Sequence, residues 1–362
     1  MAKKTYTIIT GSGSYIPQRR VPNSAFLNNR FFESYNQPIT RPNEEIIERF
    51  QQITGIDERR YIDSDMVNSD IAFRAAEQAL ISSAIDGEQL DYIIVAHNFG
   101  DVKSGSTHTD IVPSVASKVK HKLGIKNPNT VAYDLIFGCP GWLQGVIQAD
   151  YYIRSGDARH ILVIGSETLS RVSDPFDRDS MIYADGAGAV VLSASEPDVP
   201  AGILAHATRT DSLDHAYLLR MAGSFSTEDE GNHYLKMNGR KLYEYAIKTV
   251  PLAIKTAIDK SGIPITKIKS ILIHQANEKM DEAIVDRLYR LYGISVRPEY
   301  SMPMIISWLG NNSVATLPIL YNQIITGKLE NYQLNAGDYF VLASVGAGMN
   351  INALVYSIPE EA

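Results

Sequence analysis

The stretch Tyr133-Asp134-Leu135-Ile136-Phe137-Gly138-Cys139-Pro140-Gly141-Trp142-Leu143-Gln144-Gly145 holds the only cysteine of this 362-residue chain. The apolar run from Thr130 to Phe137 predicts a strand, and the apolar segment from Trp142 to Ile153 predicts a buried helix. Proline is favoured at the first position of a helix. We therefore expect Cys139 on a strand-to-helix turn, at or just before a helix N-terminus.

Two interpretations of Cys139 follow from this position. Backbone N–H groups and the helix dipole at such a turn favour an anion, so we expect a lowered thiol pKa and a more populated nucleophilic thiolate. The alternative is that a lone cysteine serves as a small buried apolar residue. The rest of the chain decides between the two.

Composition limits the class of protein. The length suits two core-bearing units or one large fold of two halves. The formal net charge of -7 argues against general nucleic-acid binding. A single cysteine excludes an intramolecular disulfide and any multi-cysteine metal site, and we expect no metal. No apolar run approaches the length of a membrane span, and Met1 to Lys4 lead into a strand without a signal-peptide pattern, so a cytoplasmic enzyme is expected.

Helical and strand patterns alternate along the chain, which predicts mostly parallel sheets covered by helices. Helices are expected at Asn43 to Thr54 with Asn43 as its cap, Ser69 to Ile85, and Val112 to Leu123. Strands are expected at Tyr6 to Thr10, Tyr92 to Ala96, His160 to Gly165, Ala189 to Leu192, and Tyr339 to Ala343.

Two glycine-rich runs are expected to end or turn the chain. Gly11-Ser12-Gly13 should end the first strand, and Asp185-Gly186-Ala187-Gly188 should form a tight, closely packed turn. A dinucleotide site at the first run is disfavoured, because no GxGxxG pattern follows and Pro17 breaks the helix that such a site needs.

An internal repeat divides the chain into two halves. The segment from Ala84 to Asn98 is echoed by the segment from Ala257 to Asn277. In both copies a helix ends near Ala-Ile-Asp and a buried strand ends at a histidine, His97 or His274. A duplicated unit predicts two layers related by a pseudo-two-fold axis. Ligands in such sheets bind beyond the carboxyl ends of the strands, where Cys139 and His274 should converge.

Four segments carry the candidate chemistry. They are Phe-Gly-Cys-Pro-Gly around Cys139, His-Gln-Ala-Asn from His274, Leu309 to Thr316 around Asn311, and the loop Gly346-Ala347-Gly348. With these segments the chain resembles the condensing enzymes of the thiolase superfamily, and within them the β-ketoacyl-acyl-carrier-protein synthase III group, over nearly its whole length.

The resemblance implies an α/β, thiolase-like fold of two pseudo-symmetric halves, with mostly parallel mixed sheets in a layered αβαβα arrangement. The N-terminal half, residues 1–200, would carry the nucleophilic cysteine. The C-terminal half, residues 201–362, would carry the histidine and the asparagine. It also implies a homodimer in which the central sheets pair across a two-fold axis.

The implied activity is that of an acyltransferase in fatty acid or polyketide biosynthesis, a branch of lipid metabolism. Cys139 would take an acyl group, and a malonyl- or β-ketoacyl thioester on acyl carrier protein would condense with it. Backbone N–H groups of Cys139 and of the loop Gly346-Ala347-Gly348 would stabilise the oxyanion. His274 and Asn311 would donate hydrogen bonds to the enolate oxygen, and His274 would also assist deprotonation of Cys139. Acyl-CoA or acyl-carrier-protein thioesters would be substrates, with no other cofactor.

The sequence departs from the group in its substrate contacts. Arg49 and Ile53 stand where acetyl-CoA-loading members carry the Trp and Arg of the CoA adenine site, while Arg178 matches the other side of that site. Val112 replaces an aromatic residue that closes the partner subunit's acyl channel, which implies a medium or longer acyl chain. Lys279 matches a basic position for docking of the acidic carrier protein. Near it, Glu244 replaces a usual lysine beside Arg240 and Lys241.

Three alternatives complete the expectations. A branch of the family condenses and then cyclises its product to dialkylresorcinol precursors with the same Cys-His-Asn set. An inactive acyl-binding homologue is disfavoured because Cys139, His274 and Asn311 are all present. Papain-like proteases share the order Cys, His, Asn, but their signature around the cysteine is absent here. We expect His97 to be structural.

Overall fold

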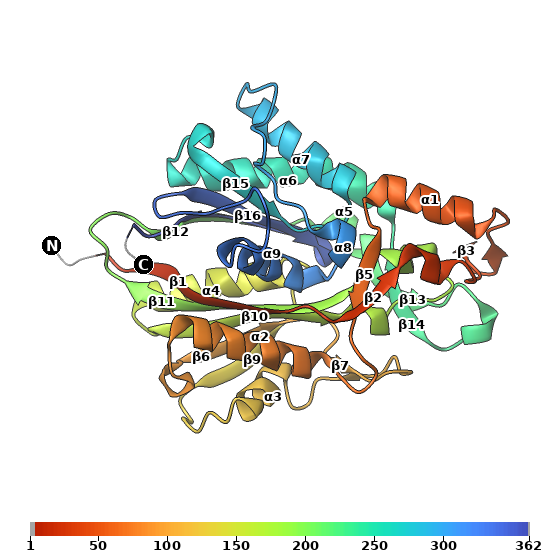
Figure 1. The fold of residues 1–362 in the computed structure, drawn as a ribbon, viewed down its shortest axis with the longest axis horizontal. Helices are drawn as coiled ribbons and strands as arrows, with labels where there is room; N and C mark the ends of the chain where they lie inside the picture. Colours follow the sequence, from red (N-terminus) through yellow and green to blue (C-terminus); the bar gives the residue numbers. More distant parts are fainter. Residues whose placement is uncertain (1–3, 361–362) are drawn as a thin grey trace.

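The chain folds as two β-sheets lying one above the other, with helices between them and on both outer sides (Figure 1). The computed structural model describes residues 4–360. The expectation that the chain has no signal-peptide pattern concerned residues 1–4, and three of these four residues lie outside the described range. The layered αβαβα arrangement confirms the expected fold class.

The first sheet has five strands and the second has four. In spatial order the first contains β1 (Tyr6–Tyr15), β11 (Asp185–Ser195), β10 (His160–Thr168), β6 (Tyr92–Ala96) and β9 (Val131–Leu135). The second contains β12 (Gly202–Thr210), β17 (Asn350–Ser357), β16 (Tyr339–Gly346) and β15 (Ile268–Ile273). Both sheets are mixed: β10, β6 and β9 run parallel, as do β15 and β16, and the other neighbours are antiparallel. The expectation of mostly parallel strands was wrong, because β1, β11, β12 and β17 join their sheets through antiparallel pairs.

The remaining strands form short two-stranded pairs at the periphery. These are β2 (Arg19–Pro22) with β5 (Glu58–Tyr61), β3 (Phe32–Ser34) with β4 (Gln37–Pro38), β7 (Asp101–Val102) with β8 (Thr109–Asp110), and β13 (Leu219–Gly223) with β14 (His233–Met237).

The α-helices of the described chain separate and cover the sheets. They are α1 (Asn43–Thr54), α2 (Asn68–Ser83), α3 (Val115–Lys122), α4 (Gly141–Ser155), α5 (Ser212–His215), α6 (Gly239–Ser261), α7 (Glu278–Leu291), α8 (Ile306–Leu309) and α9 (Thr316–Ile325). Figure 1 shows α4 and α9 between the sheets, α2 and α3 on one outer side, and α6 and α7 on the other.

The central helices are apolar on nearly every side because a sheet lies above and below them. Trp142 and Ile147 of α4 and Ile319 of α9 pack with Val163 of the first sheet and Leu342 of the second in one buried cluster. Removing this apolar surface from water is the main force that holds the two sheets together.

The repeat seen in the sequence maps onto the two sheets. The first copy is the end of α2 followed by β6, and the second is the end of α6 followed by β15. Each strand pairs in parallel with a neighbour in its own sheet. The boundary drawn at residue 200 falls in the connection between β11 and β12.

Both glycine-rich runs lie inside strands, so the expected strand end and the expected tight turn are wrong. β1 continues through Gly11 and Gly13 to Tyr15, and Gly186 and Gly188 belong to β11. A Cβ atom on Gly11 would come 2.5 Å from the carbonyl oxygen of Ala79 in α2, and one on Gly188 would come 2.7 Å from Pro318 in α9. These glycines allow close packing of helix on strand, a long-range reason that a local pattern does not contain.

Two helix starts also differ from the expectation. Asn43 is the first residue of α1 and not its cap, because its side-chain amide donates to the carbonyl oxygens of Leu27 and Asn29 at 2.8 and 2.5 Å. α3 begins at Val115, where the Ser114 hydroxyl accepts a hydrogen bond from the Ser117 N–H at 3.1 Å and caps the helix.

Candidate functional site

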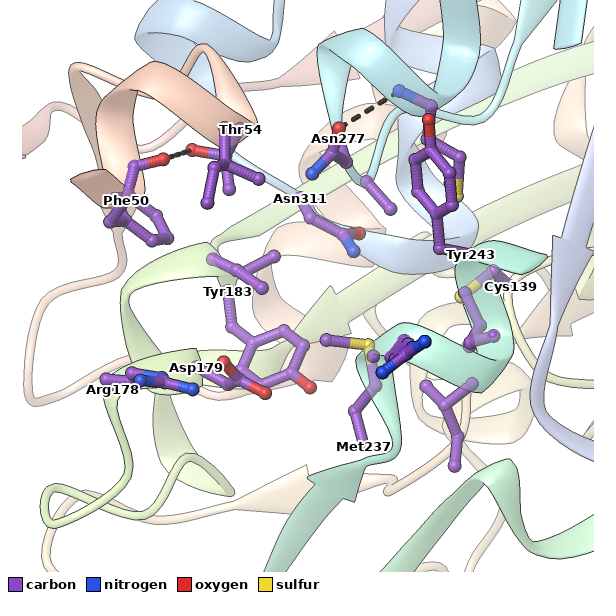
Figure 2. Close-up of a pocket in the computed structure, with 18 of the residues that line it drawn as sticks. Phe50, Thr54, Cys139, Arg178, Asp179, Tyr183, Met237, Tyr243, Asn277 and Asn311 are labelled. Atoms are coloured by element: carbon purple, nitrogen blue, oxygen red, sulfur yellow. Dashed lines mark hydrogen bonds between the residues drawn. The ribbon is translucent and has the colours of Figure 1, made fainter. Parts of the chain in front are cut away.

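A cavity of about 800 Å³ lies where strand ends from both sheets meet, and it holds most of the candidate residues. Its size is within the usual range for small-molecule sites. The structure brings six of the predicted site residues to its wall: Cys139, His274, Asn311, Gly346, Arg49 and Arg178. Figure 2 shows Cys139 and Asn311, from different elements, around this cavity.

Cys139 lies on the predicted strand-to-helix turn between β9 and α4. Gly138 before it has a positive φ of 66°, and Pro140 after it is the N-cap of α4 rather than its first residue. A Cβ atom on Gly138 would lie 2.7 Å from the backbone nitrogen of Ala347, and one on Gly346 would overlap the backbone nitrogen of Cys139. Glycine at both positions therefore lets the two backbones pack directly against each other.

The thiol of Cys139 is less acidic than the sequence analysis expected. Burial raises its pKa to about 11, and the negative charge of Glu167 adds to the rise. The hydroxyl of Ser313 donates a hydrogen bond to Sγ at 3.3 Å and works in the opposite direction. Cys139 keeps part of its surface exposed to the cavity, but the protein packed around the thiol removes enough water to outweigh the local donors, so the expectation of a lowered pKa was wrong.

Hydrogen bonds of the backbone around Asn311 fix the orientation of the Asn311 side chain. The backbone N–H of Asn311 donates to Ile182 at 2.9 Å and its carbonyl oxygen accepts from Ala184 at 2.8 Å. The side-chain oxygen Oδ1 accepts a hydrogen bond from the Ser313 N–H at 2.8 Å. With Oδ1 held in this way, the Nδ2 amide group is left to act as the donor.

His274 is the first residue after β15 and is only 3 % exposed. Burial lowers its pKa to about 4, so the imidazole is neutral at physiological pH. Its Nδ1 atom lies 3.2 Å from the hydroxyl of Thr316, which donates its own proton to Oδ1 of Asn312 at 2.8 Å. Nδ1 is therefore the donor to Thr316, and Nε2 keeps a lone pair that can accept a proton.

Positive charges gather at the mouth of the cavity. Arg49 comes from α1, Arg178 begins a short 3-10 helix, and both side chains are exposed. Arg41 and Arg240 also line the cavity. Glu244, noted in the sequence because it replaces a usual lysine, pairs with Arg240 at 3.1 Å.

Several predicted residues lie outside the cavity wall. Val112 is 84 % exposed and does not line the cavity. Lys279 is exposed at the start of α7, between the cavity-lining residues Asn277 and Met280. Ala347 and Gly348 follow Gly346 in the loop behind the wall.

The position of His97 supports the structural role expected for it. The residue is buried, and its Nδ1 atom accepts a hydrogen bond from the Gly100 N–H at 3.0 Å. Its Nε2 atom lies 2.9 Å from Asp134. Both ring nitrogens therefore face groups of the protein, and His97 does not line the cavity.

Sequence reasoning missed several polar groups of the site. Tyr183 and Asp179 line the cavity from a segment with no regular periodicity. Ser313 and Thr316 contact Cys139 and His274, and they lie in the segment from Leu309 to Thr316 that the sequence already indicated, but no role was predicted for their hydroxyls. Glu167 lies near the end of β10, two residues beyond the strand that the sequence predicted, and no pattern there indicated a role for it.

Two features are absent from residues 4–360. These residues contain no group of three or more His, Cys, Asp or Glu side chains that could hold a metal ion. None of the helices found there is long and apolar enough to cross a membrane.

The lowered pKa of His274 predicts a pH-dependent stability. Between the ordinary pKa of 6.5 and the folded value of about 4, the unfolded chain binds more protons than the folded chain. The free energy of unfolding should therefore fall as the pH falls through this window. The fall should be about 3 kcal/mol larger in the native protein than in His274→Gln. Urea unfolding at the two ends of the window measures the difference.

The exposed His108 provides the control. His108→Gln should show the same pH dependence as the native protein. An unchanged pH dependence in His274→Gln would mean that this imidazole is not held neutral by burial.

Comparison with known proteins places the chain in a family. Residues 133–212 match the family model of 3-oxoacyl-[acyl-carrier-protein] synthase III, and residues 258–358 match the model of its C-terminal part. The β-ketoacyl-[acyl-carrier-protein] synthase III of Staphylococcus epidermidis is 31% identical over 348 residues, covering 96% of this chain and 97% of that protein.

Solved structures agree with this match. The 3-oxoacyl-[acyl-carrier-protein] synthase III of Aquifex aeolicus superposes with a TM-score of 0.80 at 28% identity, over 97% of this chain and 99% of the other. A priming β-ketosynthase from the R1128 polyketide pathway gives a TM-score of 0.81 at 25% identity, over 100% and 99%. The chain therefore belongs to the β-ketoacyl-acyl-carrier-protein synthase III family, the condensing acyltransferases of the thiolase fold.

Proposed function

We propose that this enzyme loads an acyl group onto Cys139 and condenses it with a malonyl- or β-ketoacyl thioester delivered on acyl carrier protein. The observation that carries the proposal is the meeting of Cys139, His274 and Asn311 on the wall of one cavity with an arginine-rich mouth. A nucleophile, a proton acceptor and an amide donor are the groups that a Claisen condensation of thioesters requires.

In the loading step, Sγ of Cys139 attacks the carbonyl carbon of the acyl thioester. Nε2 of His274 accepts the thiol proton and passes it to the sulfur that leaves. The carbonyl oxygen becomes negative in the tetrahedral intermediate and takes hydrogen bonds from the backbone N–H groups of Cys139 and of the loop that starts at Gly346. The direct packing of these two backbones supports this assignment.

In the condensing step, loss of CO2 from malonyl leaves an enolate. With another extender, Nε2 of His274 accepts the α-proton and the same kind of enolate forms. Its oxygen accepts a hydrogen bond from Nδ2 of Asn311, whose orientation Ser313 fixes. His274 donates a second bond from Nε2 in the tautomer whose Nδ1 accepts from the Thr316 hydroxyl. The imidazole reaches this tautomer by exchange with water, gaining a proton on Nε2 and releasing the one on Nδ1. The enolate carbon then attacks the acyl group, and Cys139 leaves as a thiolate.

Arg49, Arg178 and Lys279 are proposed contacts for the phosphate-bearing arm of the donor. Phosphopantetheine carries a phosphate next to the carrier protein, and CoA carries further phosphates, so an arginine-lined mouth suits either. With Arg49 in place of the stacking Trp, delivery on the acidic carrier protein is the favoured route. The cytoplasm, where the carrier protein is found, is the proposed location.

A homodimer through the edge of the first sheet completes the proposal. β9 is the outermost strand of that sheet, and Val131 at its start and Ile136 just after it are exposed. Ile111 and Val112, which precede α3, the helix packed on β9, are exposed as well. An exposed apolar sheet edge is normally covered. Pairing β9 with its copy in an isologous interface covers it and brings Val112 to the partner's acyl channel.

Cyclisation of the product, as in the dialkylresorcinol branch, is a second candidate supported by Tyr183. Its ring is buried, it lines the cavity, and its hydroxyl has no hydrogen-bond partner among the described residues. A β-keto oxygen of a substrate would satisfy it. Tyr183→Phe should then lower kcat/KM for β-ketoacyl donors roughly tenfold while sparing unsubstituted acyl donors. Equal losses for both donors would remove this candidate.

Single-turnover condensation tests the roles of His274 and Asn311. The enzyme is first acylated on Cys139, and malonyl-carrier protein is then added while product mass is followed. His274→Ala and Asn311→Asp should each raise the activation free energy of condensation by about 2.7–4 kcal/mol, because each removes a donor to the enolate oxygen. Asn311→Asp keeps the oxygen that accepts from Ser313.

Loading should suffer less than condensation in Asn311→Asp, since Asn311 acts only on the enolate. Tyr243→Phe, which alters another cavity-lining side chain, serves as the control. Normal condensation in both variants would show that the enolate site lies elsewhere.

The proposed dimer predicts a chain-length effect from a residue outside its own cavity. Val112→Phe should shift the preference of acyl loading toward short chains, because it narrows the partner's channel and each buried CH2 contributes roughly 0.8 kcal/mol. Loading is measured with acyl donors of increasing length. Val296→Phe, at another exposed valine, should leave the preference unchanged.

Sedimentation gives an independent check of the same proposal. The native protein should sediment as a dimer at assay concentration. An active monomer, or a Val112→Phe variant with unaltered chain preference, would contradict the dimer.

A further inference from the structure

A chain of hydrogen bonds leads from Cys139 to a buried carboxyl that the proposed reaction does not use. The Ser313 hydroxyl donates to Sγ at 3.3 Å. The Asn98 side-chain amide donates to the Ser313 hydroxyl at 3.3 Å and to Oε2 of Glu167 at 2.7 Å. The backbone N–H of Asn98 also donates to Oε2, at 3.0 Å.

The direction of these bonds follows from the donors available. The amide of Asn98 has two N–H groups, and it gives one to Glu167 and the other to Ser313. The Ser313 oxygen accepts this bond, so its single proton is directed to Cys139. Glu167 thus sets the orientation of Asn98, Asn98 sets that of Ser313, and the chain ends on the sulfur.

The fold places these groups beside one another. Asn98 follows the end of β6 and Glu167 lies near the end of β10, and these strands are parallel neighbours in the first sheet. Ser313 begins the turn before α9, with a positive φ of 52°. The network therefore joins both halves of the chain at the nucleophile.

The surroundings of Glu167 mark it as more than a packing residue. Its side chain is 0% exposed, and Oε1 has no hydrogen-bond partner in the part of the chain that the structure describes. Burial raises its pKa to about 7, with His97 lowering it and Asp185 raising it. Keeping such a group buried is costly unless it serves a purpose.

We propose that Glu167 is a positioning residue for Cys139, acting through Asn98 and Ser313 to hold a hydroxyl donor on the sulfur. The held donor stabilises the thiolate as the thiol proton passes to Nε2 of His274. Glu167 itself neither gains nor loses a bond to the substrate. The inference rests on the proposed role of Cys139 as the nucleophile.

Two substitutions separate the charge of Glu167 from its hydrogen bonds. Glu167→Gln removes the charge and keeps an oxygen that can accept from Asn98. Glu167→Ala removes both. The negative charge of Glu167 opposes ionisation of Cys139, so loss of this charge alone should not slow the reaction of the thiol. A difference between the two variants therefore reports the hydrogen-bond chain.

The effect of these substitutions on the thiol is measured by the rate at which iodoacetamide alkylates Cys139. Intact-protein mass follows the reaction across the pH range in which the thiol ionises. The chain has one cysteine, so one thiol is observed. Glu167→Gln should react at least as fast as the native protein, with an apparent thiol pKa that is not raised. Glu167→Ala should react roughly tenfold more slowly than Glu167→Gln at a given pH. Asp281→Ala, at a buried carboxyl in α7, is the matched control and should react like the native protein.

A double-mutant cycle tests whether Glu167 acts through Ser313. In a Ser313→Ala background, Glu167→Ala and Glu167→Gln should react at the same rate, because the donor that Glu167 orients is gone. Asn98→Ala, at a half-buried position, breaks the same chain and should reproduce Glu167→Ala if that variant does not fold. Two outcomes would overturn the inference. One is that Glu167→Ala and Glu167→Gln alkylate at equal rates in the native background. The other is that the difference between their alkylation rates is the same with and without Ser313.

The assay needs no substrate, so its outcome is distinct from that of the proposed function. If alkylation follows the predicted pattern but no acyl group loads, the function fails and the positioning of the thiol stands. If acyl groups load and the two Glu167 variants alkylate alike, the function stands and the positioning role fails.

Discussion

The direct contact between the backbones of Gly138–Cys139 and Gly346–Ala347 is the constraint on which the site depends. One segment follows β9 of the first sheet, and the other lies at the end of β16 in the second. Side chains at Gly138 or Gly346 would collide with the opposing backbone. Because both are glycine, the two halves close on Cys139, and the N–H groups proposed for the oxyanion site lie beside it.

Burial is the second constraint, and it sets the protonation states. It raises the thiol pKa to about 11 and lowers the His274 pKa to about 4, so both groups are neutral at rest. A standing thiolate–imidazolium pair is therefore disfavoured. In the proposed loading step the proton therefore leaves Cys139 as the thioester is attacked, which makes the orientation of Nε2 and of the Ser313 donor more important than a permanently acidic thiol.

Local patterns in the sequence identified the elements with strong periodicity. The helix from Asn43 to Thr54 and the strand from Tyr92 to Ala96 have the predicted bounds, because their apolar spacing is regular. The strand ends at Cys139 and His274 were also visible, because each strand is a short apolar run. The pairing of two such runs, through the internal repeat, indicated that their ends would meet.

Features that depend on distant neighbours could not be predicted in this way. Gly11 and Gly188 resemble turn residues until the helices packed against them are known. The pKa of Cys139 depends on the walls of the cavity and not on the turn alone. Glu167 and Asn98 are far apart in the chain, and they become neighbours only because β10 and β6 lie side by side in the first sheet.

The central claim is that Cys139 carries the acyl group in this cavity, and intact-protein mass after incubation with a panel of acyl-CoA and acyl-carrier-protein donors tests it most directly. The account predicts that the native enzyme gains the mass of one acyl group from its preferred donor, that the group maps to Cys139, and that folded Cys139→Ala gains none. Equal acylation of Cys139→Ala, or acylation of the native enzyme at another residue, would contradict it.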